Sequence, residues 1–145
     1  MERDQILSEI LIQYQKKYTT VTEIYRLTEE MIGLLNHDDR VSTQLILNMR
    51  QEEMDRAEEC GGALATLKEQ LSAGQRQHLS AVLEASDDRE LTESWEEKKI
   101  AEIYQNTQTV LQKTIELDKR VNLKLAGKDS YYRQNNRASR EDSYV

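Results

Sequence analysis

The residues best suited to catalysis or metal binding are few in this 145-residue chain, and they are widely spaced. His37 and His78 are its only two histidines. A di-iron helical bundle needs a glutamate three residues before a histidine on two helices. Leu34 and Gln75 occupy those positions, so this site is excluded. We expect no metal ion and no cofactor.

The remaining candidates for chemistry also have simpler structural explanations. The stretch 37–39, His-Asp-Asp, could hold a surface metal ion, but it fits a helix-capping turn better. Cys60 has no second cysteine and no neighbouring histidine, so we interpret it as a small buried hydrophobic residue. The glutamate pairs at 52–53, 58–59 and 96–97 lie at helical spacing from Arg and Lys, as on solvated helix faces. There is also no glycine-rich phosphate loop, so we predict no catalytic residues and no enzymatic activity.

Composition predicts an all-helical protein that binds neither nucleic acid nor membranes. The chain has no proline and 5 glycines, with 37% hydrophobic and 32% charged residues, which is typical of long helices that bury a narrow stripe. The net charge of -7 repels nucleic-acid phosphates and anionic lipid head groups. No apolar run approaches the ~20 residues that a bilayer requires, and the N-terminus is unlike a signal peptide. We expect a cytoplasmic protein.

The spacing of apolar residues predicts four helices. They cover about residues 4–35, 40–71, 75–85 and 87–125, and Asp38 or Asp39 should cap the second. Asp87 and Glu90 have the spacing of a capping box for the last helix. The predicted inner face of the second helix consists of Val41, Leu45, Met49, Ala57, Cys60, Leu64, Leu67 and Leu71. Gly61 and Gly62 interrupt this helix, where they permit a close helix approach, mark a bend or are simply tolerated.

The last helix has the most regular stripe, with steps of three and four residues. It consists of Ile100, Ile103, Thr107, Val110, Thr114, Leu117 and Val121. Gly127 is placed to cap its C-terminus. We therefore predict an elongated antiparallel bundle of three long helices and one short helix over residues 1–127, and a flexible polar tail over 128–145.

A protein-binding surface is the function that the pattern favours. The seam of the last helix is mainly core, but at its end, around Val121, Leu123 and Leu125, core coverage should run out. We predict that one edge of this helix binds a partner helix. Its residues are Val110, Leu111, Leu117, Val121 and Leu125. The tail has no Leu, Ile or Met, yet it carries Tyr131 and Tyr132, whose side chains have the traits of recognition anchors.

The chain resembles the FlgN-like flagellar export chaperones. The resemblance lies in the ending R-V-N-L-K-L-A-G-K-D-S-Y-Y at 120–132, where a long amphipathic helix runs into a leucine-glycine turn followed by a tyrosine. The second helix, with D-D-R-V near its start and R-Q-E-E-M further on, also looks like the family's. Gly61-Gly62 and the long basic segment after Tyr132 depart from the family pattern.

The resemblance implies a chaperone for hook-filament junction proteins. It would cover the terminal helix of its substrate, prevent premature assembly and bring the substrate to the flagellar type III export gate. Two other classes of function remain open. One is a coiled-coil homodimerisation module, in which the seam of the last helix pairs with itself. The other is an adaptor unrelated to flagella, in which the tail alone binds the partner.

Overall fold

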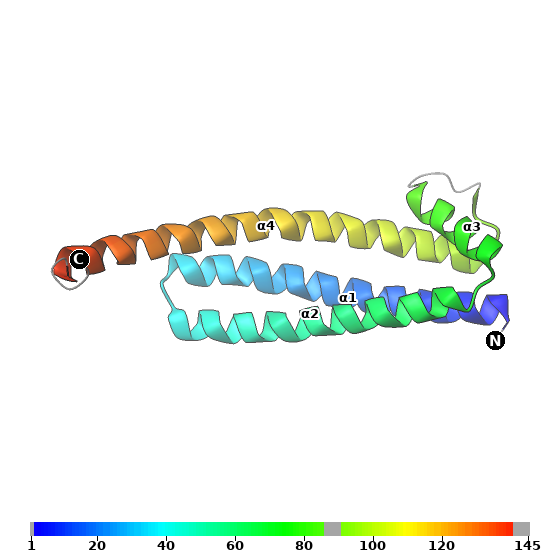
Figure 1. Ribbon diagram of the computed structural model, residues 1–145, viewed down its shortest axis with the longest axis horizontal. Coiled ribbons are helices and arrows are strands. Elements are labelled where there is room, and N and C mark those ends of the chain that lie inside the picture. The colour runs from blue at the N-terminus through cyan, green and yellow to red at the C-terminus, as the bar shows by residue number, and fades with distance from the viewer. Residues whose placement is uncertain (1, 86–90, 141–145) are drawn as a thin grey trace.

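The computed structural model describes residues 2–85 and 91–140, with side chains described up to residue 127. These residues form four helices: α1 (Arg3–Asn36), α2 (Arg40–Glu69), α3 (Ala73–Glu84) and α4 (Trp95–Arg140). Three of them are long and one is short, and together they make an elongated bundle (Figure 1). The predicted all-α class is confirmed.

The turn between α1 and α2 is set by two aspartates. Asp39 is the N-cap of α2, and its Oδ1 accepts a hydrogen bond of 3.0 Å from the Ser42 backbone N–H. This hydrogen bond is the main cause that lowers the pKa of Asp39 below its ordinary value. Asp38 has a φ of 56°, a left-handed conformation that aspartate tolerates better than most residues. The predicted cap at this turn is confirmed.

The helices α3 and α4 begin at different residues from those predicted. Ser72 and Gln75 form a capping box with two hydrogen bonds of 3.2 Å, so α3 begins at Ala73 rather than Gln75. The helix α4 begins at Trp95, where the Ser94 Oγ accepts a hydrogen bond of 3.2 Å from the Glu97 N–H. The predicted capping box of Asp87 and Glu90 lies outside the described residues.

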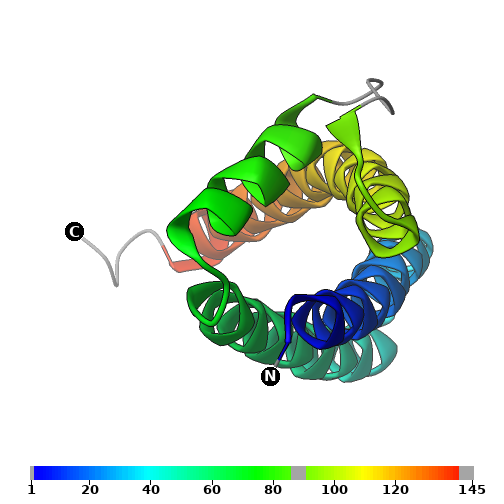
Figure 2. The ribbon, with the colours of Figure 1, turned by 90° about the vertical axis from the view of Figure 1, so that its right-hand side faces the viewer.

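The helix α1 lies between α2 and α4 and packs along both of them. The chain turns back after α1, so α2 is antiparallel to it, whereas α4 runs in the same direction as α1 (Figure 1). The short α3 packs across the beginning of α4, at the end of the bundle where the chain starts (Figure 2). The opposite end, at the α1–α2 turn, is therefore built from α1, α2 and α4.

The hydrophobic core is divided into two clusters. The first lies at the end of the bundle that contains α3, and all four helices contribute to it: Ile6, Leu7, Ile10, Leu11, Tyr14, Leu64, Leu71, Leu79, Leu83 and Ile100. The second lies near the α1–α2 turn: Leu27, Met31, Leu35, Ile46 and Val121. Burial of these side chains is the main favourable term in folding, at about 25 cal/mol per Å² of apolar surface.

Buried threonines contribute polar groups to the interior of the bundle. Thr28, Thr107 and Thr114 are buried, and each hydroxyl donates to the backbone carbonyl four residues earlier at 2.7 to 2.8 Å. These bonds satisfy the hydroxyl groups without a partner from another helix. Two buried members of the α4 stripe are therefore threonines. Burial of a threonine stabilises the fold less than burial of a leucine or isoleucine of the two clusters.

The expected glycine cap at the end of α4 is wrong, because the helix continues through Gly127 to Arg140. A glycine ends a helix when it takes the left-handed conformation, and none of the described glycines has a positive φ. Glycine inside a helix costs only about 1 kcal/mol relative to alanine, so the helix can run through it. The prediction of a flexible tail over 128–145 stays a prediction, and residues 141–145 lie outside the described part of the chain.

Gly61 and Gly62 do not serve a close helix approach. A Cβ atom added at either residue would meet nothing within 4 Å. The close-approach explanation that the sequence left open is therefore excluded.

No helix in the described ranges is both long enough and apolar enough to cross a membrane.

Candidate partner-binding surface

Three apolar side chains of α2 are exposed next to the α1–α2 turn. They are Val41, Leu45 and Met49, which we call the α2 stripe, and the first two are 83% and 58% exposed. Their spacing of four residues places them along one face of the helix. Exposed apolar residues that form a row, rather than standing singly, are characteristic of sites where another protein binds.

The prediction that the α2 stripe lies on the inner face of the helix is wrong. At this end of α2 the buried residues are Thr43 and Ile46, and Ile46 belongs to the second core cluster. Ile46 packs with Leu27, Met31 and Leu35 of α1, whereas Leu45 is exposed. Both residues fit an apolar stripe, and only the fold decides which of them is buried.

The five residues predicted as a partner-binding edge on α4 do not form one exposed surface. Val121 is only 3% exposed and belongs to the second core cluster, so it supports the fold. Val110, Leu111 and Leu117 are half-buried. Leu125 is 38% exposed. Of these five residues, only Leu125 is exposed.

The segment around Leu125, which we call the α4 end, contains Leu123 and Leu125, and Leu123 is 73% exposed. Lys124 between them donates a hydrogen bond to the side chain of Asn36, the last residue of α1. From there α4 extends past the α1–α2 turn (Figure 1). Tyr131 and Tyr132 lie on this extension, and their side chains are outside the described residues.

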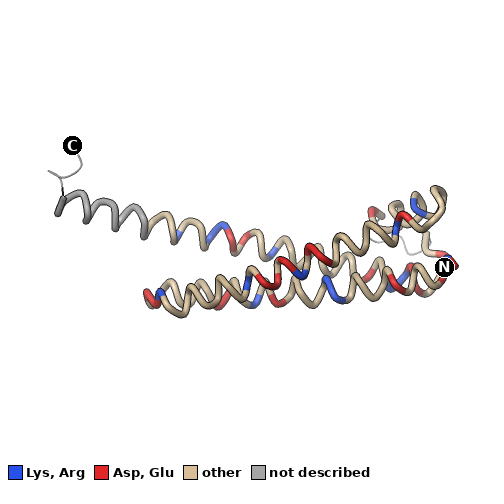
Figure 3. The backbone as a smooth tube through the Cα atoms, turned by 60° about the horizontal axis from the view of Figure 1, so that its bottom comes forward, with Lys and Arg blue, Asp and Glu red and all other residues tan. Residues whose placement is uncertain are grey.

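Charged residues of both signs are interleaved along the long helices (Figure 3). Arg26 pairs with Glu23 at 2.5 Å and with Glu30 at 3.2 Å on α1, and the hydrogen bond from Arg26 lowers the pKa of Glu23. Arg56 pairs with Glu53 on α2 in the same way. Exposed pairs of this kind contribute little to stability, which agrees with the predicted solvated faces for these two helices.

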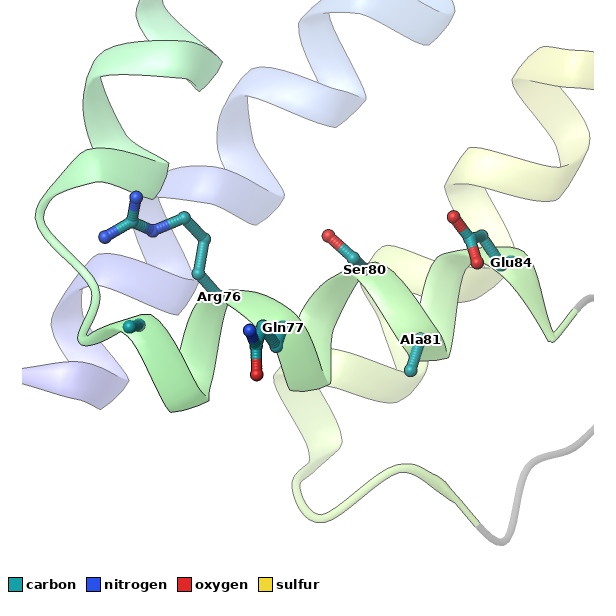
Figure 4. A pocket seen from close by; sticks show the side chains of 6 residues that line it. Arg76, Gln77, Ser80, Ala81 and Glu84 are labelled. Atoms are coloured by element: carbon teal, nitrogen blue, oxygen red, sulfur yellow. The ribbon is translucent and has the colours of Figure 1, made fainter.

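A shallow depression on α3 does not gather catalytic groups. Its lining consists of Ala73, Arg76, Gln77, Ser80, Ala81 and Glu84, all from this one helix (Figure 4). The Arg76 guanidinium donates to the carbonyl of Leu71 at 3.3 Å, at one end of the row, and Glu84 lies at the other end. Since no second element contributes to the lining, this depression lacks the converging groups of an active site.

Cys60 and His37, which were considered as candidates for chemistry, each have a structural role. Cys60 is buried on α2, as predicted. His37 is the C-cap of α1, and its backbone N–H donates to the Leu34 carbonyl at 3.1 Å.

Comparison with protein-family models, with curated proteins and with solved structures gives no match to this chain. Its function is therefore argued from its residues and from their arrangement.

Proposed function

We propose that this protein is a cytoplasmic export chaperone for flagellar hook-filament junction proteins. In this proposal it binds the terminal helix of its substrate, prevents premature assembly and assists delivery to the type III export gate. The observation that carries the proposal is the exposed α2 stripe, which lies at the same end of the bundle as the α4 end. The protein has no catalytic role in this proposal.

The α2 stripe is suited to an amphipathic helix. A partner helix that presents apolar residues three and four positions apart can cover Val41, Leu45 and Met49 along one line. Methionine adapts its shape to different partners, a property that recurs at surfaces binding several sequences. Three side chains bury a modest area, so binding stays reversible, and an export chaperone must release its substrate.

The ending at 120–132 adds support from its resemblance to the FlgN-like chaperones. Leu123 and Leu125 of that ending are exposed, as a binding role requires. Gly127 differs from the family pattern, because here the helix continues where the pattern has a turn. The proposal therefore rests on the exposed leucines and not on the glycine.

The direct test is a titration of the protein with a synthetic terminal helix from a junction protein. We expect the Val41→Lys/Leu45→Lys variant to weaken binding by on the order of 2 kcal/mol, the effect of an interface hot spot. Ile12→Lys is the matched control, because Ile12 is an exposed apolar residue in the first turns of α1, far from the α2 stripe. Equal affinity of the double variant and the parent would place the binding surface elsewhere. If the parent binds no junction-protein helix, the proposed function is wrong.

A second candidate function, a homodimerisation module, is favoured by the same exposed stripe. A second copy of the chain could cover Val41 and Leu45 in place of a substrate helix. Light scattering on the purified protein distinguishes the two. A tight dimer that becomes a monomer in the Val41→Lys/Leu45→Lys variant supports the module, whereas a monomeric parent excludes it.

A further inference from the structure

A buried glutamate lies where α3 meets the beginning of α4. Glu97, in the first turn of α4, is only 2% exposed. Its Oε1 accepts a hydrogen bond of 2.9 Å from Nη2 of Arg3. Its Oε2 accepts one of 2.9 Å from the Glu93 N–H and lies 3.1 Å from Nε2 of His78. The carboxylate is therefore fixed in one orientation, with one oxygen directed to α1 and the other to α3.

The two carboxylate oxygens of Glu93 also face Arg3 and His78. Its Oε2 accepts a hydrogen bond of 3.1 Å from Arg3, and its Oε1 lies 3.7 Å from Nε2 of His78. Arg3 thus occupies one oxygen of each carboxylate, and the other oxygen of each faces the same imidazole nitrogen. The hydrogen bond to Glu97 is the main cause that raises the pKa of Arg3.

These three residues have the spacing of metal ligands. One ligand atom from each of His78, Glu93 and Glu97 lies within 4.8 Å of the other two. Zinc binds imidazole nitrogen and carboxylate oxygen at about 2.0–2.2 Å, so tetrahedral ligand atoms are about 3.3–3.6 Å apart. The distances of 3.1 and 3.7 Å from Nε2 to the two carboxylates bracket this range.

We propose that His78, Glu93 and Glu97 form a binding site for a divalent transition-metal ion, with zinc as the best-matched ion. Arg3 would hold the outer oxygens of both carboxylates, as hydrogen-bond donors around metal sites orient the ligands. Its positive charge opposes ions held mainly by charge, such as Mg²⁺ and Ca²⁺. It is less unfavourable for zinc, which binds imidazole strongly.

The cluster is exposed on one side, so a water molecule could serve as the fourth ligand of a bound ion. The side chain of Glu93 is 60% exposed and that of His78 is partly exposed, so one side of the cluster is open to water. A bound ion would join α3 to the beginning of α4, while Arg3 joins the same carboxylates to α1. The site would therefore hold three helices together at the end of the bundle away from the α2 stripe.

The prediction that no metal ligands converge is wrong, because the structure brings His78, Glu93 and Glu97 together. His78 and Glu97 are 19 residues apart, with the α3–α4 connection between them. Their approach depends on how α3 packs on α4, which residue spacing does not reveal. The prediction that Glu97 lies on a solvated helix face is also wrong, because its side chain is buried.

The test is a zinc titration of the metal-free full chain, without an affinity tag, followed by calorimetry. We expect one equivalent of Zn²⁺ to bind, and Co²⁺ to give the visible absorption of a tetrahedral site. At a free zinc concentration about 100 times the Kd, Tm should rise by roughly 5–10 °C. A parent protein that binds no zinc below about millimolar concentration would show that the cluster is an ion-pair network only.

Single substitutions identify the ligands. His78→Gln and Glu93→Gln should each weaken zinc binding at least tenfold, and Glu93 is exposed enough for its variant to fold. His37→Gln is the matched control, since His37 lies at the α1–α2 turn, and it should bind zinc as the parent does. Unchanged binding in His78→Gln or in Glu93→Gln would overturn the assigned ligand set. None of these outcomes depends on whether the protein is an export chaperone.

Discussion

Arg50 on α2 donates from Nη2 to both carboxylate oxygens of Asp118 on α4, at 2.5 and 2.7 Å. The Arg50 side chain is largely buried, and its Nε has no hydrogen-bond acceptor among the described residues. The two residues lie within one turn of Ile46 and Val121 of the second core cluster. The pair therefore links the two helices that flank α1, next to the core.

Asp118→Asn should destabilise the protein by about 1–2 kcal/mol, because it removes the charged acceptor of a largely buried guanidinium. Asp118 is about one third exposed, so the cost should stay below the 3–5 kcal/mol of a fully buried pair. Urea unfolding measures the change. An Arg50→Met/Asp118→Leu double variant should recover much of the loss, and an Asp118→Asn variant as stable as the parent would mean that water screens the pair.

Gly61→Ala and Gly62→Ala should each stabilise the protein by up to about 1 kcal/mol. Both glycines lie inside α2, where alanine loses less conformational entropy on folding. An added Cβ at either position would meet nothing within 4 Å, so no steric cost opposes the gain. The midpoint of urea unfolding should rise at an unchanged m-value. A fall in stability would indicate that another chain packs closely on this part of α2.

The helical segments could be predicted from sequence because each depends on local information. The range of α1 follows from its apolar spacing, and the beginning of α2 follows from the Asp39 cap. The structure begins α3 at Ala73, two residues before the predicted start, because Ser72 and Gln75 form a capping box. The bounds of α4 differ more from the prediction, since the helix begins at Trp95 and continues through Gly127 to Arg140.

Which apolar side chains are buried was harder to predict, because burial depends on contacts between helices. Leu45 and Ile46 are adjacent and both are apolar, yet only Ile46 is buried. Val121 was expected at the edge of the bundle, but α1 and α2 extend far enough to cover it. The exposed α2 stripe was therefore missed, although its residues had been recognised as an apolar row.

Val121 and Leu125 should respond differently to substitution by aspartate. Val121→Asp places a charge in the second core cluster and should destabilise the protein by more than about 3 kcal/mol. Leu125→Asp should change stability by less than about 0.5 kcal/mol, because Leu125 lies on the exposed α4 end. If the α4 end binds a partner helix, Leu125→Asp should still weaken that binding. Chemical unfolding and peptide titration on the same samples separate the two effects, and equal stability of the two variants would contradict the assignment of Val121 to the core.

The last prediction concerns Tyr131 and Tyr132, which lie on the part of α4 beyond the last residue of α1. Replacing both with alanine should leave Tm unchanged, because α1 and α2 do not reach this part of the helix (Figure 1). If the tyrosines anchor a substrate or the export gate, the same variant should weaken that interaction by on the order of 2 kcal/mol. Deletion of residues 134–145 is the matched control, since it keeps both tyrosines and should have a much smaller effect. A double-alanine variant that binds both partners as tightly as the parent would exclude a docking role, and the interaction would then rest on the α2 stripe and the exposed leucines of the α4 end.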